Sequence, residues 1–192
     1  MQKPTGYDEL QNNGDFVPVN LGGHTAVIKR VQETTSKNGR PMLQIALDFD
    51  QKDAQAGYFK QMFDDDNRAD KKWPFQGTQY ILTEDQDGKC ARSFKSFITS
   101  VEDSNNAQCQ WGNNFEGWFK NKKVGVVFGE VEDEYNGEIK TRRRIRYFCS
   151  YDKAKTAAVP AKKLFKGGQT ATPVIDDGFM SIPNTSEEEI PF

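Results

Sequence analysis

Residues 25–49 read TAVIKRVQETTSKNGRPMLQIALDF, and this stretch decides the fold class that the sequence predicts. Residues 25–34 are rich in β-branched side chains and partly alternate between apolar and polar positions, which is typical of a strand. Turn formers fill residues 35–41, including an Asn-Gly pair, a strong hairpin signal. The last part then carries an apolar side chain at every second position: Leu43, Ile45, Leu47 and Phe49. The stretch therefore predicts a long antiparallel hairpin.

The other periodic segments complete a five-stranded pattern. Residues 78–83 predict a third strand, and residues 91–101 predict a helix, since their apolar residues recur at helical spacing. Residues 122–135 and 138–150 predict a second hairpin around another Asn-Gly pair. Three strands, a helix and two strands follow the order of the OB-fold, although other five-stranded arrangements share it. The predicted fold is all-β with one helix, an OB-fold five-stranded barrel.

Composition divides the rest of the chain. Residues 50–77 and 105–121 predict long irregular insertions that carry many aromatic side chains. After residue 152 the chain becomes rich in Ala, Lys, Thr, Pro and Gly, which is typical of a flexible linker and predicts a disordered C-terminal tail. The predicted organisation is an N-terminal extension, an OB-fold domain, a linker and an acidic tip: residues 1–19, 20–152, 153–186 and 187–192.

Charge and cysteine content narrow the class of protein. The net charge is −2, but five acids and no Lys or Arg follow residue 175, so the preceding part is mildly basic. Three widely spaced cysteines favour reduced thiols over a disulfide framework or a zinc site. No apolar stretch predicts a signal peptide or a membrane span, and we expect a cytoplasmic protein without membrane contact.

The last predicted strand is rich in arginine. Strand alternation would place Ile145 and Tyr147 on one face, and Arg142, Arg144 and Arg146 on the other, about 7 Å apart. That spacing is close to the phosphate repeat of an extended single strand, and arginine both pairs with phosphates and stacks on bases. The alternative is a solvated face, balanced by glutamates across the hairpin.

Other basic and aromatic side chains lie at the predicted hairpin tips and in the insertions. Proteins bind single-stranded nucleic acid through ring stacking inside a positively charged groove, so these residue types together predict a single-stranded DNA site. The predicted DNA-binding residues are Lys29, Lys37, Arg40, Lys72, Trp73, Phe75, Trp111, Trp118, Lys122, Lys123, Tyr135, Arg142, Arg144 and Arg146.

An enzyme is the weaker alternative. Asp64, Asp65 and Asp66, with Asp48 and Asp50, could hold Mg²⁺ for phosphodiester hydrolysis. However, the side chains of consecutive aspartates usually point in several directions. The sequence also contains a single histidine, so it offers few candidates for a general acid or base. No nucleotide-binding loop or serine nucleophile motif is present in the sequence. We therefore expect no enzymatic activity and no cofactor.

The sequence finishes on SEEEIPF, residues 186–192. Acids followed by Ile190, Pro191 and Phe192 predict a segment that a partner buries in an apolar, basic-rimmed pocket. The alternative is an acidic solubility tail.

Residues 187–192, Glu187, Glu188 and Glu189 followed by Ile-Pro-Phe, resemble the C-terminal tip of bacterial single-stranded DNA-binding proteins (SSB). The resemblance implies an OB-fold body that binds single-stranded DNA and a tip that docks replication, recombination and repair enzymes. The long N-terminal extension and insertions are more similar to a phage- or mobile-element-type relative. The cellular family forms tetramers, so the resemblance also allows a homo-oligomer. A tip-bearing interaction module without DNA affinity is the alternative function.

Overall fold

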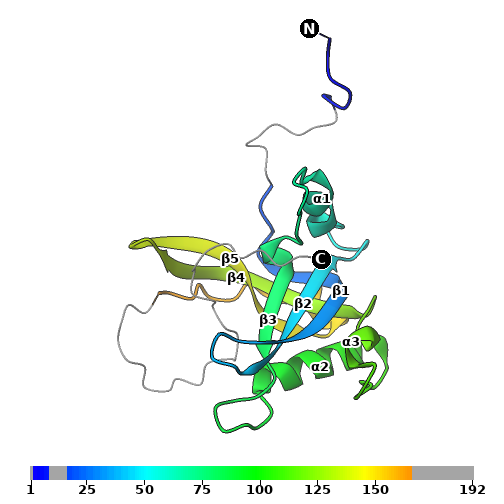
Figure 1. The fold of residues 1–192 in the computed structure, drawn as a ribbon, viewed down its shortest axis with the longest axis vertical. Coiled ribbons are helices and arrows are strands. Elements are labelled where there is room, and N and C mark those ends of the chain that lie inside the picture. The colour runs from blue at the N-terminus through cyan, green and yellow to red at the C-terminus, as the bar shows by residue number, and fades with distance from the viewer. Residues whose placement is uncertain (1, 9–16, 166–192) are drawn as a thin grey trace.

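The computed structural model describes residues 2–8 and 17–165, and its main element is one antiparallel sheet (Figure 1). Its strands are β1 (Gly22–Thr35), β2 (Pro41–Phe49), β3 (Thr78–Leu82), β4 (Lys123–Tyr135) and β5 (Glu138–Cys149). They lie in the order β3-β2-β1-β4-β5. Both predicted hairpins and the third strand are confirmed. The sheet is open, since no ladder joins β3 to β5 in the part of the chain that the structure describes.

The helices are α1 (Tyr58–Asp65), α2 (Arg92–Asn105), α3 (Phe115–Trp118) and α4 (Tyr151–Ala154), with a 3-10 turn η1 (Phe75–Gly77). The predicted helix corresponds to α2. The segments predicted as irregular contain α1 and α3 as well. Because Asp48 of β2 accepts hydrogen bonds from the backbone N–H groups of Phe59 and Lys60, the start of α1 is fixed by a remote residue. None of the described helices is both long and apolar enough to cross a membrane.

The hydrophobic core lies between the inner face of the sheet and the helices. Every residue from Leu43 to Phe49 is buried, but only the alternate residues Leu43, Ile45, Leu47 and Phe49 belong to the core cluster, which confirms that they share one face. Phe97 of α2 stacks on Phe119 with ring centroids 5.4 Å apart. Such aromatic pairs add to the stabilisation from apolar burial. Together these contacts hold α2 across one end of the sheet (Figure 1).

A β-bulge interrupts β5. Phe128 pairs with Ile145 but Val127 pairs with Tyr147, so Arg146 is an extra residue in the strand. Ile145 and Phe148 therefore both face the core, with 4% and 5% exposure, while Tyr147 is 39% exposed. The predicted sharing of one face by Ile145 and Tyr147 is wrong, because simple alternation cannot anticipate an inserted residue.

The chain after β5 packs against the outer face of the sheet. Residue 163 bridges β4 in parallel: the Lys163 backbone N–H donates to Glu130 (2.9 Å), and its carbonyl accepts from Glu132 (2.8 Å). We call residues 155–165 the strap. Ala154 is 1% exposed, so the packed body continues past residue 152 into the predicted linker.

The chain after β5 can pack closely against β1 because residue 23 is a glycine. A Cβ at that position would lie 1.8 Å from the carbonyl oxygen of Ala154. Gly23→Ala is expected to lower the free energy of unfolding by about 1–3 kcal/mol, since the end of α4 and the start of the strap must shift. Urea denaturation measures this. Gly117→Ala is the matched control, because its Cβ would meet only the movable side chain of Asn114. Equal losses in both variants would contradict the packing role of Gly23.

Candidate nucleic-acid interface

One face of the β4–β5 hairpin combines aromatic rings with cationic side chains. Cross-strand partners share a face of a sheet, and here they are Gly129 with Arg144, Val131 with Arg142, Asp133 with Lys140, and Tyr135 with Glu138. Phe75 of η1 reaches the same face. We define the aromatic–basic strip as Phe75, Tyr135, Lys140, Arg142 and Arg144. In Figure 1 this hairpin extends beyond the rest of the sheet.

Phe75 and Arg144 form one end of the strip. The guanidinium carbon of Arg144 lies 4.3 Å from the ring centroid of Phe75, which is 51% exposed. Arg144 also pairs with Asp133, with 3.5 Å between Nη2 and Oδ2. Burial lowers the pKa of Arg144, and Asp133 opposes that effect; arginine nevertheless stays charged. The contact links β5 to the segment before β3 across the open side of the sheet.

Tyr135 forms the other end, at the hairpin tip. The turn residues Asn136 and Gly137 have φ of 53° and 78°, as a tight two-residue hairpin loop requires. Lys140 Nζ and the Arg142 guanidinium carbon lie 5.4 and 5.7 Å from the centroid of the Tyr135 ring. The ring is 38% exposed. The strip thus offers two partly exposed rings, each with at least one cation over the ring.

Phe75, in the turn directly before β3, leads from the strip to the face of β3, β2 and β1 that lies opposite the core. The cross-strand register of this face joins Gln32, Gln44 and Tyr80 in one row, and Arg30, Ala46 and Thr78 in the next. Burial raises the pKa of Tyr80, so its phenol stays neutral and can donate a hydrogen bond. Sequence reasoning missed Tyr80 and Lys140 as site residues. The alternation of side chains along a strand could have identified both. Tyr80 lies on the face opposite the buried Ile81, and Lys140 lies on the same face as Arg142 and Arg144.

Arg146 lies on the same face as the strip, since its Cγ would lie 2.8 Å from a Cβ at Gly129, the cross-strand partner of Arg144. The Nη1 of Arg146 donates to the carbonyl oxygens of Ala161 (3.0 Å) and Glu130 (3.5 Å), so it anchors the strap to β4. Arg142, Arg144 and Arg146 therefore share one face, as predicted, but only Arg142 and Arg144 lie against the rings of the strip.

Of the predicted tryptophans, Trp118 belongs to the core and the partly buried Trp73 packs against it. Trp73 donates its Nε1–H to the carbonyl oxygen of Leu47 at 3.0 Å. Trp118 is only 7% exposed. Trp111 is different, since it is 65% exposed and its ring stacks on Phe115 with centroids 5.3 Å apart, but it lies beside α3. The structure does not place these three rings with the strip.

The predicted lysines spread over the molecule. Lys122 and Lys123 lie at the start of β4, over the rings of Trp118 and Tyr151. Lys123 is separated from Tyr135 by the length of β4, about 40 Å at 3.3 Å per residue. Lys72 is half-buried beside Trp73.

The remaining predicted cations belong to β1 and its turn. Lys37 and Arg40 occupy the β1–β2 turn, where Arg40 Nη2 donates to the Glu84 carbonyl at 2.8 Å. Lys29 sits at a bulge in β1, 3.9 Å from Asp48.

Four of the five acids of the nuclease alternative have separate partners. Asp48 accepts a backbone hydrogen bond from the N-terminus of α1, and Asp50 accepts a hydrogen bond from the Tyr151 hydroxyl. Asp64 pairs with Lys60, and Arg68 Nη2 lies 2.8 Å from Asp66. Across residues 2–8 and 17–165, no group of three or more His, Cys, Asp or Glu side chains is placed to hold a metal ion.

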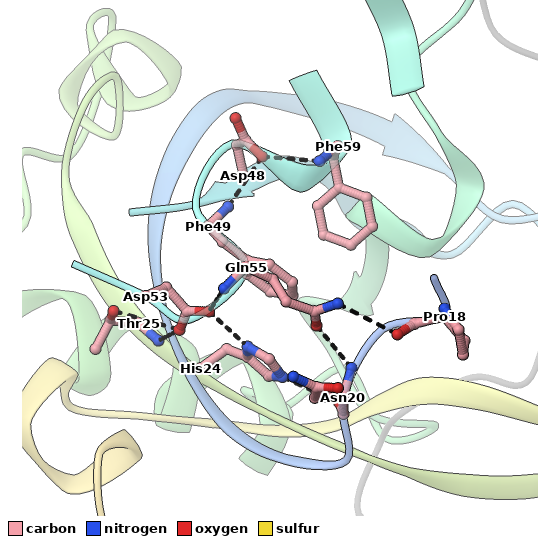
Figure 2. A network of polar contacts seen from close by, with 9 residues as sticks. All are labelled: Pro18, Asn20, His24, Thr25, Asp48, Phe49, Asp53, Gln55 and Phe59. Carbon is pink, nitrogen blue, oxygen red and sulfur yellow. Dashed lines mark hydrogen bonds and ion pairs between the residues drawn. The ribbon is translucent and has the colours of Figure 1, made fainter. Parts of the chain in front are cut away.

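The single histidine belongs to a buried polar network (Figure 2). His24 Nδ1 lies 2.9 Å from Asp53 Oδ1, and Nε2 lies 3.0 Å from the Asn20 carbonyl oxygen. The two side chains are 4% and 6% exposed. Gln55 accepts from the Asn20 N–H (2.7 Å) and donates to the Pro18 carbonyl (3.2 Å). The network ties residues 17–20 and the loop before α1 to the start of β1.

Asp53 is the centre of that network. Its Oδ2 accepts the backbone N–H of Thr25 at 2.8 Å, and its Oδ1 accepts that of Gln55 at 3.0 Å. Burial alone would raise the pKa of Asp53, but the His24 interaction and the two N–H groups outweigh it, so the pKa lies below 3.8. The arrangement stabilises the fold and leaves no ring nitrogen of His24 open to a substrate.

The predicted tip, residues 187–192, lies outside the described residues, as does the linker from residue 166. No protein-family model and no curated protein sequence matches this chain, so the assignment of a function depends on the geometry described above.

Proposed function

We propose that this chain is a non-enzymatic, sequence-independent single-stranded DNA-binding protein, and that its body is an OB-fold. The aromatic–basic strip carries the proposal, because it joins two partly exposed rings to three cations on one face. The strand order, with α2 between β3 and β4, supports the OB-fold. The Phe75–Arg144 contact brings the two ends of the open sheet together.

The chemistry of the strip favours a single strand over a duplex. Phe75 and Tyr135 would stack on unpaired bases, and stacking tolerates every sequence because each base has a π-face. Arg142, Arg144 and Lys140 would pair with phosphates, so affinity should fall as salt increases. The strip offers few donors and acceptors that could distinguish one base edge from another.

The second part of the proposal concerns residues 187–192. We infer that this acidic, Phe-terminated segment recruits replication, recombination and repair enzymes to the bound DNA. In this division of labour the body binds DNA and the tip binds proteins.

Titration with a fluorescent oligothymidine of about 20 nucleotides tests the DNA-binding part. The full chain is expected to bind it far more tightly than a duplex of equal length, with an affinity that decreases with salt. A chain lacking residues 187–192 serves as the control and should bind at least as tightly. Absence of binding would refute the proposal and favour an interaction module that lacks DNA affinity.

A further inference from the structure

We propose that a groove between β1 and α3 is a second phosphate-binding segment for the same single strand, which rests on the DNA-binding function proposed above. The groove has a volume of about 310 Å³ and is lined by Lys29, Arg30, Gln32, Glu116 and Lys120, among others. It lies beside the outer face of β1, away from the β4–β5 hairpin. None of these side chains belongs to the aromatic–basic strip.

The charges of the groove suit an anion. Three cations line it against one carboxylate, and that carboxylate is already engaged, since Glu116 Oε1 accepts the Glu33 backbone N–H at 2.6 Å. Lys29 is 38% exposed, and its Nζ lies 3.9 Å from Asp48, whose buried carboxylate already accepts the backbone N–H groups of Phe49 and Phe59. Lys120 is exposed. Phosphate can therefore enter without breaking a strong internal pair of either lysine.

The backbone around the groove explains why a phosphate fits better than a peptide strand. The pairing of β1 with β4 ends at Val27, so the following part of β1 has an edge that faces α3. A bulge lies at Lys29, and both Lys29 and Arg30 line the groove beside this edge. A peptide could pair with such an edge as an additional strand, but the backbone N–H of Glu33 already donates to the Glu116 carboxylate. A phosphate needs no backbone hydrogen bonds and can bind through the cationic side chains alone.

The groove is continuous with the outer face of the sheet. Arg30 shares a row with Ala46 and Thr78, and Thr78 directly follows η1, which carries Phe75. Neighbouring strands are about 4.8 Å apart, so β3 and β1 are separated by about 10 Å. A strand stacked on Phe75 therefore needs only a few more nucleotides to cross β3 and β2 and reach Lys29 and Lys120.

The test is a titration of the full chain with oligothymidines of increasing length, comparing wild type with a Lys29→Ala, Lys120→Ala double variant. Short oligonucleotides that fill the strip alone should bind both proteins equally. Long ones should bind the variant roughly tenfold more weakly, with a salt slope smaller by about 1.4, because each lost single-strand contact removes about 0.7. Lys95→Ala, Lys153→Ala is the matched control, since both lysines are exposed and neither lines the groove.

A second variant makes the opposite prediction. Glu116→Gln keeps an oxygen that can accept the Glu33 N–H but removes the only acid that lines the groove, so long oligonucleotides should bind more tightly. Equal effects of the lysine variant at every length, or none at any length, would overturn the groove assignment. Failure of the wild-type protein to bind any oligothymidine would instead overturn the proposed function itself.

Discussion

Replacing Arg142 and Arg144 together by alanine is expected to weaken single-stranded DNA binding about a hundredfold at moderate salt. Each arginine lies against a partly exposed ring of the strip, so each change removes a phosphate partner and a support for a stacked base. A stacked base contributes about 1–3 kcal/mol, and 1.4 kcal/mol corresponds to a tenfold change in affinity. Fluorescence titration with oligothymidine measures the effect.

The neighbouring Arg146 provides the matched control for this experiment. It has the same side chain on the same strand, but it donates to the strap instead of lining the strip. Arg146→Ala should therefore lower stability and leave DNA affinity within about twofold, since it removes no strip contact. Lysine at positions 142 and 144 should give an intermediate affinity, because it keeps the charge but not the planar stack. If Arg146→Ala weakened DNA binding as much as the double variant, the strip would be assigned wrongly.

Asp53→Ala is expected to lower the free energy of unfolding by about 3 kcal/mol or more, since it removes one partner of a buried, hydrogen-bonded pair. The change leaves His24 Nδ1 and two backbone N–H groups without their acceptor. Urea denaturation at neutral pH measures the loss. Asp87→Ala is the control, because Asp87 is exposed in a surface turn. A loss below about 0.5 kcal/mol, the usual range of surface changes, would contradict the role given to the network.

The same network predicts how stability changes with pH. The pKa of Asp53 in the folded protein lies below its ordinary value of 3.8. Its carboxylate therefore stabilises the fold at pH values above 3.8, and this contribution disappears as the pH falls through the lower, folded-state pKa. The difference in stability between wild type and Asp53→Asn should be largest near neutral pH and shrink in strong acid. A difference that grows on acidification would reverse the sign and contradict the assignment.

The hairpins could be predicted from the sequence because their determinants are local. Apolar residues alternate along β2, and an Asn-Gly pair supplies the positive φ angles at the β4–β5 turn. The start of α1 could not be predicted in this way, since its backbone N–H groups bond to Asp48, a residue in a strand. The packing of the strap likewise depends on Gly23 and β4, which are distant in the sequence.

The candidate site was predicted only in part, for the same reason. Alternation along β5 identified Arg142, Arg144 and Arg146 as one row, but it could not show that the guanidinium of Arg146 is bound by the strap. Composition alone could not show which aromatic residues of the insertions are buried and which reach the candidate site. Trp118 lies in the core and Trp73 packs against it, whereas Phe75 reaches a strand that begins more than sixty residues later. Which ring meets which arginine is a property of the tertiary structure.

Photo-cross-linking tests the central proposal most directly. An oligothymidine containing 5-bromodeoxyuridine would be bound to the full chain and irradiated, and the modified residues would be identified by mass spectrometry. The proposal predicts cross-links at Phe75 and Tyr135, the two exposed rings of the strip, and their loss in the Arg142→Ala, Arg144→Ala variant. Cross-links confined to Trp111 or to residues outside the strip, or no cross-link at all, would contradict it.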